Sequence, residues 1–362
     1  IVAKVCVFAL KTLRETVEFL NYPDSRAPLK ISLEDLFKKN LLPQVDFSEV
    51  KGHYLAKRAI EIAVAGGHNI LMIGPPGSGK TMLAKRIPTI MPDLSLAEAL
   101  EVTKIHSVTG KLAIKDGLIS QRPFRNTHHN ISSSVLVGGG TIPQPGEISL
   151  AHYGVLFLDE LPEFHRDCLE ALRQPLDDGF IRVSRINKSF LFPANFMLVA
   201  AMNPCPCGYY TDPKKPCRCN PNKIVNYMGK ISGPLLDRID IHIEMPPLKY
   251  KELTDANESE ASAKIKERVE KARAIQRERF ENDGIFYNAQ MHTKLIKKYC
   301  ILQEESRELL GLAMAELGLS GRAYDRILKV SRTIADLLES EDIESGHISE
   351  AIQYRSMDRR IF

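Results

Sequence analysis

The sequence has 362 residues, of which 44% are hydrophobic and 26% charged, and its formal net charge is +4. Such a chain is long enough for two or three domains, and its mild basic excess permits a nucleic-acid partner without requiring one. No apolar run approaches the roughly 18 residues of a membrane span, and the first residues lack the flanks of a signal peptide, so we expect a cytoplasmic protein with no membrane partner.

The chain opens with a strand-like run, Val5–Leu10, and a helix-like pattern, Thr12–Leu20. Because the first residue is not Met, we expect that a region upstream is missing. We interpret residues 1–22 as the end of a domain. Residues 23–45 follow as a linker, because turn-forming Pro, Asn, Asp and Ser are concentrated where it begins.

A short apolar run, Ile70–Ile73, leads directly into a glycine-rich loop that ends in Lys-Thr. The loop consists of Gly74, Pro75, Pro76, Gly77, Ser78, Gly79, Lys80 and Thr81. Its glycines let backbone N–H groups surround phosphate oxygens, Lys80 can reach the β and γ phosphates, and the Thr81 hydroxyl can bind Mg²⁺. A helix predicted over Met82–Ile87 points its N-terminus at the anion. The pattern predicts binding of ATP and Mg²⁺.

Two further apolar runs end in polar residues of the kinds that phosphoryl transfer uses. Val155–Leu158 is followed by Asp159 and Glu160, and the run that ends at Met202 is followed by Asn203. Asp159 would bind Mg²⁺ through water, and Glu160 would polarise the attacking water. Asn203 is placed to orient water or to sense the γ phosphate. Alternatively, the two carboxylates stand at the end of a buried strand by chance. The phosphate loop in the same chain argues against this interpretation.

Two polar stretches are candidates for roles near the nucleotide. His53 or Tyr54 could approach the adenine, or pack without touching it. Ser120–His129 is too polar for the core and is either an ordinary surface loop or a working loop. We favour the working loop because basic side chains cluster there, namely Arg122, Arg125, His128 and His129.

Alternating polar and apolar residues over Ile181–Phe192 predict a β-hairpin. Its basic residues, Arg182, Arg185 and Lys188, could contact a phosphate backbone, but basic side chains on a solvated strand face are equally consistent with the pattern.

Four cysteines, Cys205, Cys207, Cys217 and Cys219, lie within fifteen positions among prolines and a glycine. They could converge on one tetrahedral Zn²⁺, which we favour over reduced or redox-active thiols. The remaining three cysteines are isolated and suit packing.

Helical periodicity covers much of the remaining chain. We expect helices at Leu94–Ile105, Arg166–Pro175, Glu258–Phe280, Lys294–Tyr299, Glu304–Leu317, Arg322–Leu338 and Ile348–Tyr354. The third of these is long and highly charged, which suggests a connector. Arg238 lies between a helix-like end and the next strand, and Arg322 opens a helix after Leu319-Ser-Gly321.

Taken together, the motifs resemble those of the magnesium-chelatase-like ComM/YifB family of AAA+ ATPases. They are GPPGSGKT, RPFRNTHHNISSS, LVGGG, PGEISLAHYGVLFLDELPEF, LEALRQPLDDG, AAMNPCPCG, SGPLLDRID and LSGRAYDRILKVSRTIADL. The resemblance implies an α/β fold, in which a P-loop AAA+ domain at residues 46–250 has a parallel sheet flanked by helices. A helical connector and all-α lid domain follow at residues 251–362. Residues 1–22 would be the remnant of a Lon-protease-like N-terminal domain.

The resemblance also assigns roles to individual residues. Lys80 and Thr81 match the Walker A loop, Asp159 and Glu160 the Walker B pair, Asn203 sensor 1, Arg238 an arginine finger and Arg322 sensor 2. The Arg182–Phe192 hairpin corresponds to one that faces the central pore in related ring motors.

This family relationship implies a homo-oligomeric, hexameric ring that couples ATP hydrolysis to translocation on single-stranded or branched DNA. Its function would be branch migration during the integration of transforming DNA. The alternative is a magnesium-chelatase or MoxR-type ATPase that remodels a protein or metal-complex client. Basic hairpin residues favour DNA, whereas Phe190 and Phe192 would favour polypeptide if they faced the pore. A regulatory module without turnover is a third possibility, which the intact Glu160 weakens.

Overall fold

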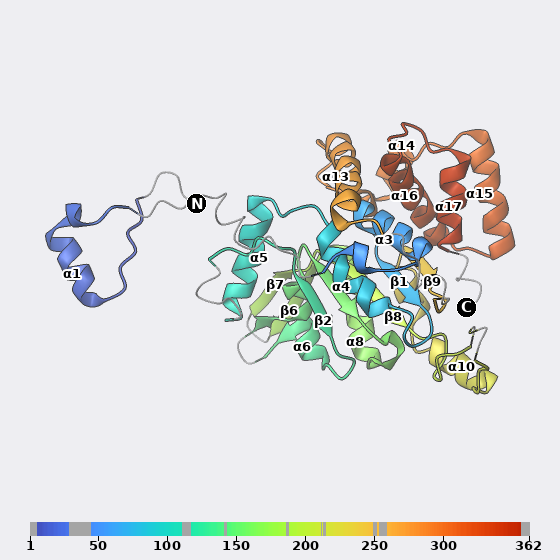
Figure 1. The fold of residues 1–362 in the computed structure, drawn as a ribbon, viewed down its shortest axis with the longest axis horizontal. Helices are drawn as coiled ribbons and strands as arrows, with labels where there is room; N and C mark the ends of the chain where they lie inside the picture. Colours follow the sequence, from blue (N-terminus) through green and yellow to red (C-terminus); the bar gives the residue numbers. More distant parts are fainter. Residues whose placement is uncertain are drawn as a thin grey trace.

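The computed structural model describes residues 6–28, 45–110, 117–140, 143–185, 188–210, 212, 215–248, 252 and 259–355. A parallel sheet with helices on both faces forms its centre, and a bundle of helices packs beside it (Figure 1). Among the described helices, none has both the length and the apolar character needed to cross a membrane.

The central sheet has five parallel strands in the order β2-β5-β8-β1-β9. These strands are β1 (Ile70–Ile73), β2 (Phe124–Thr127), β5 (Val155–Leu158), β8 (Met197–Met202) and β9 (Ile241–Glu244). The three inner strands are apolar throughout because helices cover both faces of the sheet. Their carboxyl ends lie along one edge, where the polar residues that follow them meet.

Successive side chains of each strand enter two different cores, as the two-residue period of a strand requires. On one face, Ile70 and Met72 pack against α3 (Tyr54–Gly66) and α4 (Lys80–Ile90). On the other face, Leu71 and Ile73 join a second core. Its helices are α6 (Ser133–Val137), α7 (Glu147–Leu150), α8 (Arg166–Ala171), α10 (Pro221–Met228) and α11 (Gly233–Leu236).

Two small antiparallel ribbons accompany the sheet. One is β3 (Gly138–Gly139) with β4 (Gln144–Pro145), and the other is β6 (Phe180–Arg185) with β7 (Lys188–Pro193). The second ribbon is the hairpin that the alternating pattern predicts. Short 3₁₀ turns occur at η1 (Pro23–Ser25), η2 (Phe47–Glu49), η3 (Leu161–Glu163) and η4 (Asn288–Gln290).

The helical part that follows consists of α13 (Ser262–Arg279), α14 (Thr293–Tyr299), α15 (Glu304–Leu317), α16 (Gly321–Leu337) and α17 (Ser345–Gln353). Its central helix is α16, which packs against α13, α17 and α3. All four helices predicted after residue 290 are present with bounds shifted by at most three residues.

Three local predictions need correction. The helix expected over Arg166–Pro175 is two helices, α8 and α9 (Arg173–Asp178), because Pro175 lacks the N–H that would continue the first one. Helix α5 (Leu96–Val108) starts later than predicted because Ser95 and Glu98 form a capping box.

The third correction concerns the N-terminal segment. Residues 6–11 form no strand, whereas Val5 lies outside the described residues. No described strand pairs with this run, and an unpaired strand leaves its backbone groups unsatisfied. The helix predicted next to it is present as α1 (Leu13–Asn21), capped by the Thr12 side chain.

Candidate nucleotide-binding site

The phosphate loop joins β1 to α4 and has the backbone shape that anion binding requires. Gly77 and Gly79 have positive φ angles of 78° and 82°, a region that other residues rarely enter. A side chain at Gly74 would collide with the Met245 carbonyl oxygen. Helix α4 begins at Lys80 and therefore directs its N-terminal N–H groups at the loop. This cradle fits the phosphates of a nucleotide.

Lys80 lies over the cradle. Its Nζ donates hydrogen bonds to the carbonyl oxygens of Gly74 at 2.6 Å and Pro75 at 3.0 Å, and it is 3.3 Å from Asn203 Oδ1. Burial lowers the pKa of Lys80, while the negative charges of Asp159 and Glu160 oppose this shift. Phosphate oxygens could compete for the same N–H groups, so the ammonium is already at the place where it is needed.

The sheet register explains why Asn203 reaches Lys80. Ile73 of β1 pairs with Met202 of β8, so the residues that follow these two positions emerge side by side. The Gly74 N–H donates to the Met202 carbonyl at 3.1 Å, which extends the pairing by one residue. Asn203 and the phosphate loop are therefore neighbours, although Lys80 and Asn203 are 123 positions apart in the chain.

Thr81 and Asp159 provide oxygen atoms suited to Mg²⁺. The Thr81 hydroxyl donates to Asp159 Oδ2 at 2.7 Å. Hydroxyl and carboxylate oxygens are ligands that this hard cation prefers, often with waters between. Asp159 Oδ1 also accepts a hydrogen bond from the Glu160 N–H at 3.0 Å, which fixes the turn after β5. The pair fits a magnesium ion bound beside the phosphates.

Glu160 follows in an unusual conformation. Its φ is 55°, in the left-handed region, and its side chain is 51% exposed. One carboxylate oxygen, Oε2, lies 3.1 Å from Nδ1 of His129. The sequence placed His129 in a polar loop without a partner. In the sequence, only the adjacent residues His128 and His129 hint at a polar contact here. Which residue they contact depends on which strand lies next to β2.

His53 also lies beside the phosphate loop. A side-chain carbon at Gly79 would be 3.4 Å from His53 Nε2, and this buried nitrogen has no hydrogen-bond partner among the described residues. Burial lowers the pKa of His53, which favours the neutral imidazole. By contrast, Tyr54 is 70% exposed. Of the two residues considered for the adenine, His53 is the one that the fold brings to the loop.

The two candidate arginines lie together on another part of the surface. Arg238 Nε donates to both carboxylate oxygens of Asp177 at 2.9 Å. Arg322 Nη1 is 3.3 Å from Asp237, the residue directly before Arg238. The structure therefore brings Arg238 and Arg322 to one surface, where acids of this chain hold them.

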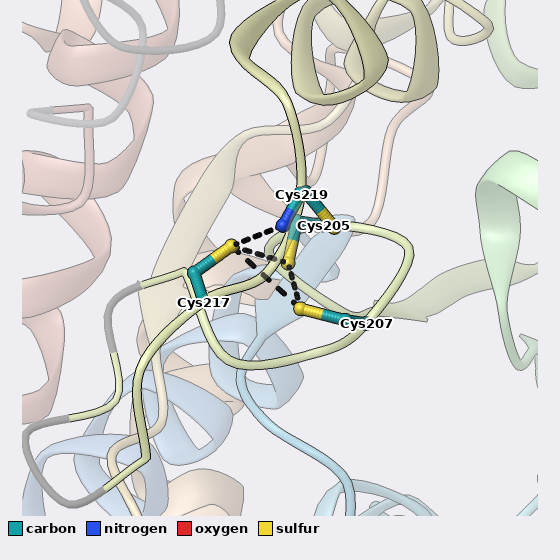
Figure 2. Close-up of side chains that lie close together, drawn as sticks. All are labelled: Cys205, Cys207, Cys217 and Cys219. Carbon is teal, nitrogen blue, oxygen red and sulfur yellow. Dashed lines mark hydrogen bonds between the residues drawn. The ribbon is translucent and has the colours of Figure 1, made fainter.

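The four cysteines converge (Figure 2). Their sulfur atoms lie within 4.8 Å of one another, and the separations among Cys205, Cys207 and Cys217 are 3.3, 3.6 and 3.7 Å. Zinc bound by thiolates at about 2.3 Å in a tetrahedron would place sulfurs about 3.8 Å apart. Backbone N–H groups of Arg218 and Tyr209 lower the pKa of Cys207 to about 6, which favours one thiolate. At Cys217, a backbone hydrogen bond from Cys219 is outweighed by burial and the neighbouring thiols, which raise the pKa of Cys217 to about 12. The cluster fits Zn²⁺.

The cysteine loop, residues 205–219, packs against the nucleotide site. Gly208 has a φ of 85°, and a side chain there would collide with the ring of Pro76 in the phosphate loop. Buried Tyr227, just beyond the cysteine loop, accepts a backbone hydrogen bond from Asn203. The loop that carries the four cysteines is thus in contact with the phosphate loop.

The polar stretch Ser120–His129 contains residues that contact other parts of the fold and residues that lie beside the nucleotide site. Arg122 donates to the carbonyl oxygen of Tyr153 at 2.8 Å, and Arg125 pairs with Glu147 at 2.6 Å. These two arginines fasten the edge of the sheet, so the working-loop interpretation holds for neither of them. His128 and His129 lie at the carboxyl end of β2, beside the Walker B turn, with ring centroids 4.2 Å apart.

The β6–β7 hairpin presents Arg182 to solvent. The backbone register pairs Arg185 with Lys188, whose side chains lie outside the described part of the chain. Phe190 and Phe192 are half-buried, with ring centroids 6.4 Å apart, and Phe192 packs against the core.

The chain is similar to known protein families and known proteins over most of its length. The model of the family "Magnesium chelatase, subunit ChlI" matches residues 46–253, and the C-terminal model of the same subunit matches residues 259–355. Competence protein ComM of Haemophilus influenzae is 47% identical over 355 residues, covering 96% of this chain and 68% of ComM. YifB of Escherichia coli is 47% identical over 318 residues, covering 87% of this chain and 61% of YifB.

A more distant relative is the chloroplastic magnesium-chelatase subunit ChlI of Oryza sativa, 21% identical over 330 residues, which are 83% of this chain and 67% of that subunit. The chain spans about two thirds of the length of these relatives. The matches over both parts of the chain agree with the parallel sheet, the phosphate loop and the helical C-terminal part. The chain belongs to the magnesium-chelatase-like ComM/YifB family of AAA+ ATPases.

Proposed function

We propose that this chain is the motor part of a ring-forming ATPase that couples ATP hydrolysis to translocation on DNA. The observation that carries the proposal is the meeting of Lys80, Thr81, Asp159 and Asn203 at the carboxyl edge of the sheet, with Glu160 beside them. This set provides phosphate binding, metal binding and a carboxylate for water activation.

Each residue has a role in hydrolysis that follows from its position. Lys80 neutralises phosphate charge, and Asn203 orients the γ phosphate or the attacking water. Glu160 accepts the proton of that water. Mg²⁺ held by Thr81 and Asp159 would stabilise the negative charge that phosphoryl transfer develops. His53 lies beside Gly79 of the phosphate loop, where it could contact the nucleotide.

The arginines support an assembly. Arg238 and Arg322 are held on one surface by Asp177 and Asp237, away from the hydrogen bonds of the phosphate loop. An arginine finger stabilises transition-state charge when it enters the site of a neighbouring subunit. We propose that Arg238 acts in this way and that Arg322 is the sensor 2 arginine. A head-to-tail interface of this kind closes into a ring, and we propose a hexamer.

The nucleic-acid partner rests on less direct support. Arg182 is exposed on β6, and its hairpin neighbours in sequence are basic. Phe190 and Phe192 are half-buried on the same hairpin, so they offer little aromatic surface for gripping polypeptide. The relative with 47% identity is named a competence protein, and we extend that role to this chain as recombination of incoming DNA. Branch migration would be the form of translocation involved.

We also propose that the cysteine loop holds a structural Zn²⁺. The proposal rests on the short sulfur separations and on the contact of Gly208 with the phosphate loop. We propose residues 46–250 as the ATPase domain and residues 251–362 as connector and lid.

The deciding experiment measures phosphate release by the assembled protein with and without single-stranded or forked DNA at two salt concentrations. Stimulation that fades as salt rises is expected, because backbone contacts release counterions. Glu160→Gln should abolish turnover in every condition. ATP hydrolysis that assembled rings perform equally with and without each DNA would contradict the DNA motor and favour the chelatase-type remodeller of a protein client.

A further inference from the structure

A cavity of about 610 Å³ lies at the amino ends of the strands. Its wall includes Gly67 shortly before β1, Gly154 directly before β5 and Phe196 directly before β8. Because these strands are parallel, the residues that precede them share one edge of the sheet, and the phosphate loop after β1 lies at the other edge. The four residues of β1 separate the two edges by about 10 Å. The cavity is therefore separate from the nucleotide site, and its size suits a small organic molecule.

Helix α13 forms another part of the wall and contributes two arginines. Arg273 and Arg277 both line the cavity, and a spacing of four residues places them on one face of the helix. Arg277 is exposed, whereas Arg273 is partly buried, with its guanidinium 4.4 Å from the centre of the Tyr287 ring. Like charges at this spacing repel each other, so an anion between them would be stabilising.

Arg273 also has a donor without an acceptor in the described part of the chain. Its Nη2 donates to the Val64 carbonyl at 2.9 Å, but its Nε is buried and has no hydrogen-bond partner there. A buried donor without an acceptor is destabilising. Burial and the charges of Arg122 and Arg277 lower the pKa of Arg273 to about 10, which Tyr287 opposes. An anionic acceptor at Nε would satisfy the donor and balance the charge.

Acidic residues line the cavity as well, but each contacts a basic side chain other than Arg273 and Arg277. These contacts are Asp93 with Lys266, Glu98 with Arg122, Glu101 with His152 and Glu270 with Lys266, at 2.6, 3.5, 3.5 and 3.8 Å. Among the described residues, no acid forms an ion pair with Arg273 or Arg277. The two arginines are thus the part of the wall that can receive an anion.

The remaining wall is apolar and held in place by hydrogen bonds. Leu94 and Met197 are buried and line the cavity. The Tyr287 hydroxyl donates to Asn195 Oδ1 at 2.5 Å, and the Tyr153 N–H donates to the Asn195 carbonyl at 2.6 Å. Small-molecule sites combine a pre-formed apolar wall with a few placed polar groups, and this cavity has both features.

We propose that this cavity binds a small organic anion with a planar apolar ring, whose carboxylate or phosphate group lies against Arg273 and Arg277. The ring packs against Leu94 and Met197. Such a ligand joins α13 to the amino edge of the sheet and leaves the nucleotide site free. The proposal goes beyond ATP hydrolysis and DNA translocation, and its test measures binding without either of them.

The test titrates the full chain in a calorimeter with 1-naphthyl phosphate, 1-naphthoate and the neutral 1-naphthol. At least one of the two anions should bind with a Kd of about 100 µM or lower, and 1-naphthol should bind at least about tenfold more weakly. The preferred anion distinguishes a phosphate site from a carboxylate site. Saturating ATP with Mg²⁺ should leave the Kd unchanged, because the two sites lie at opposite edges of the sheet.

The variants test whether the anions bind in this cavity. Arg273→Gln should weaken binding about tenfold or more, as the loss of a charge-assisted hydrogen bond does. Ala97→Trp fills the cavity from the exposed side of α5 and should also abolish binding, which keeps the test decisive if Arg273→Gln does not fold. The matched control is Arg307→Gln, which removes an exposed arginine that pairs with Glu304 on α15 and should leave the Kd unchanged. Thermal unfolding verifies that each variant is folded.

Four results would overturn the proposal. They are no binding of either anion at about 1 mM, equal binding of 1-naphthol and the anions, displacement of the anion by ATP, and wild-type affinity in folded Arg273→Gln or Ala97→Trp. Failure of the DNA motor appears separately, as ATP hydrolysis that DNA does not stimulate.

Discussion

Two polar clusters lie at different parts of the fold. In one the side chains surround a loop and are partly exposed, and in the other they are buried against one another. At the carboxyl edge of the sheet, Lys80, Thr81 and Asp159 surround a glycine-rich cradle, and Glu160 beside them is half exposed. Where α16 meets the residue before β9, Asp240 is buried between His68 and Arg326, at 3.5 and 2.8 Å. We call the first set the nucleotide cluster and the second the lid cluster.

The lid cluster extends along α16 through Asp336, which accepts hydrogen bonds from Asn288 at 2.8 Å and Arg332 at 3.1 Å and pairs with Arg279. His68 also contacts Thr333 at 2.8 Å. Charges in this cluster compensate one another inside the protein, so removing one leaves its partner buried and unpaired. In the nucleotide cluster, the polar residues surround the phosphate loop, and Glu160 is half exposed. Polar groups thus serve chemistry in one place and rigidity in the other.

The largest expected effect is a loss of ATP hydrolysis without a loss of stability, on substitution of Glu160 in the nucleotide cluster. Glu160→Gln should lower kcat by about 10³-fold, because the amide cannot accept a proton from water. ATP binding and the melting temperature should match wild type, since the carboxylate is half exposed. Phosphate release, nucleotide titration and thermal unfolding measure the three quantities. A kcat within tenfold of wild type would remove Glu160 from the proposed mechanism.

The corresponding change in the lid cluster should act on stability. Asp240→Ala leaves Arg326 without its buried partner and should lower the free energy of unfolding by about 3 kcal/mol. The exposed Asp342→Ala serves as control and should change it by less than about 0.5 kcal/mol. Denaturant unfolding measures both variants. A small loss for Asp240→Ala would show that the lid cluster is not a structural tie.

The pH dependence of stability should come from the same aspartate. Burial raises the pKa of Asp240, but Arg326 and His68 outweigh burial, so the net pKa lies below its ordinary value. A carboxyl group with a lowered folded pKa contributes stability above its unfolded pKa of about 3.9, and this contribution is lost as pH falls towards the folded pKa. Wild-type stability should therefore fall more steeply below about pH 4 than that of Asp240→Asn. Parallel curves for the two proteins would contradict this assignment.

A smaller effect on ATP binding is expected when the proposed zinc is lost. Cys207→Ser should release zinc and raise the KM for ATP roughly fivefold, equivalent to about 1 kcal/mol, because the cysteine loop supports the phosphate loop through Gly208 and Pro76. Exposed Cys6→Ser is the matched control. Metal content and ATPase kinetics give the answer. Full zinc occupancy in Cys207→Ser, or an unchanged KM after zinc loss, would contradict the prediction that the metal supports ATP binding.

The smallest expected effect concerns the hairpin. Arg182→Ala should weaken DNA binding a few-fold and reduce the slope of log K against log salt by about one, as the loss of one phosphate contact does. Binding to several sequences should weaken equally, because phosphate contacts carry no base information. An unchanged salt slope would place the DNA elsewhere on the protein.

Local signals in the sequence were sufficient for much of the fold. The glycine-rich loop after Ile70–Ile73, the acids after Val155–Leu158 and the helices after residue 290 each depend on residues close together in the chain. Glycine conformation, apolar runs and helical periodicity act over short distances, so they can be interpreted without knowing the sheet order. The break between α8 and α9 was missed although Pro175 was visible.

Contacts across the sheet were beyond the reach of those signals. Arg122 and Arg125 were expected in a working loop, but the fold directs them at Tyr153 and Glu147. The pairing of Asp240 with Arg326 joins residues 86 positions apart, and nothing local indicates it. Such contacts depend on which helix covers which strand.

From the sequence alone one can predict a strand, a glycine-rich loop and a helix of the kind that binds nucleotides, and four cysteines close enough in the chain to share a metal. Which polar residues meet depends on how distant parts of the chain pack. Strand order placed β2 beside β5 and so brought His129 to Glu160. The packing of α16 brought Arg326 to Asp240. Backbone conformation depends on neighbouring residues in the chain, whereas side-chain contacts of this kind depend on how distant elements pack.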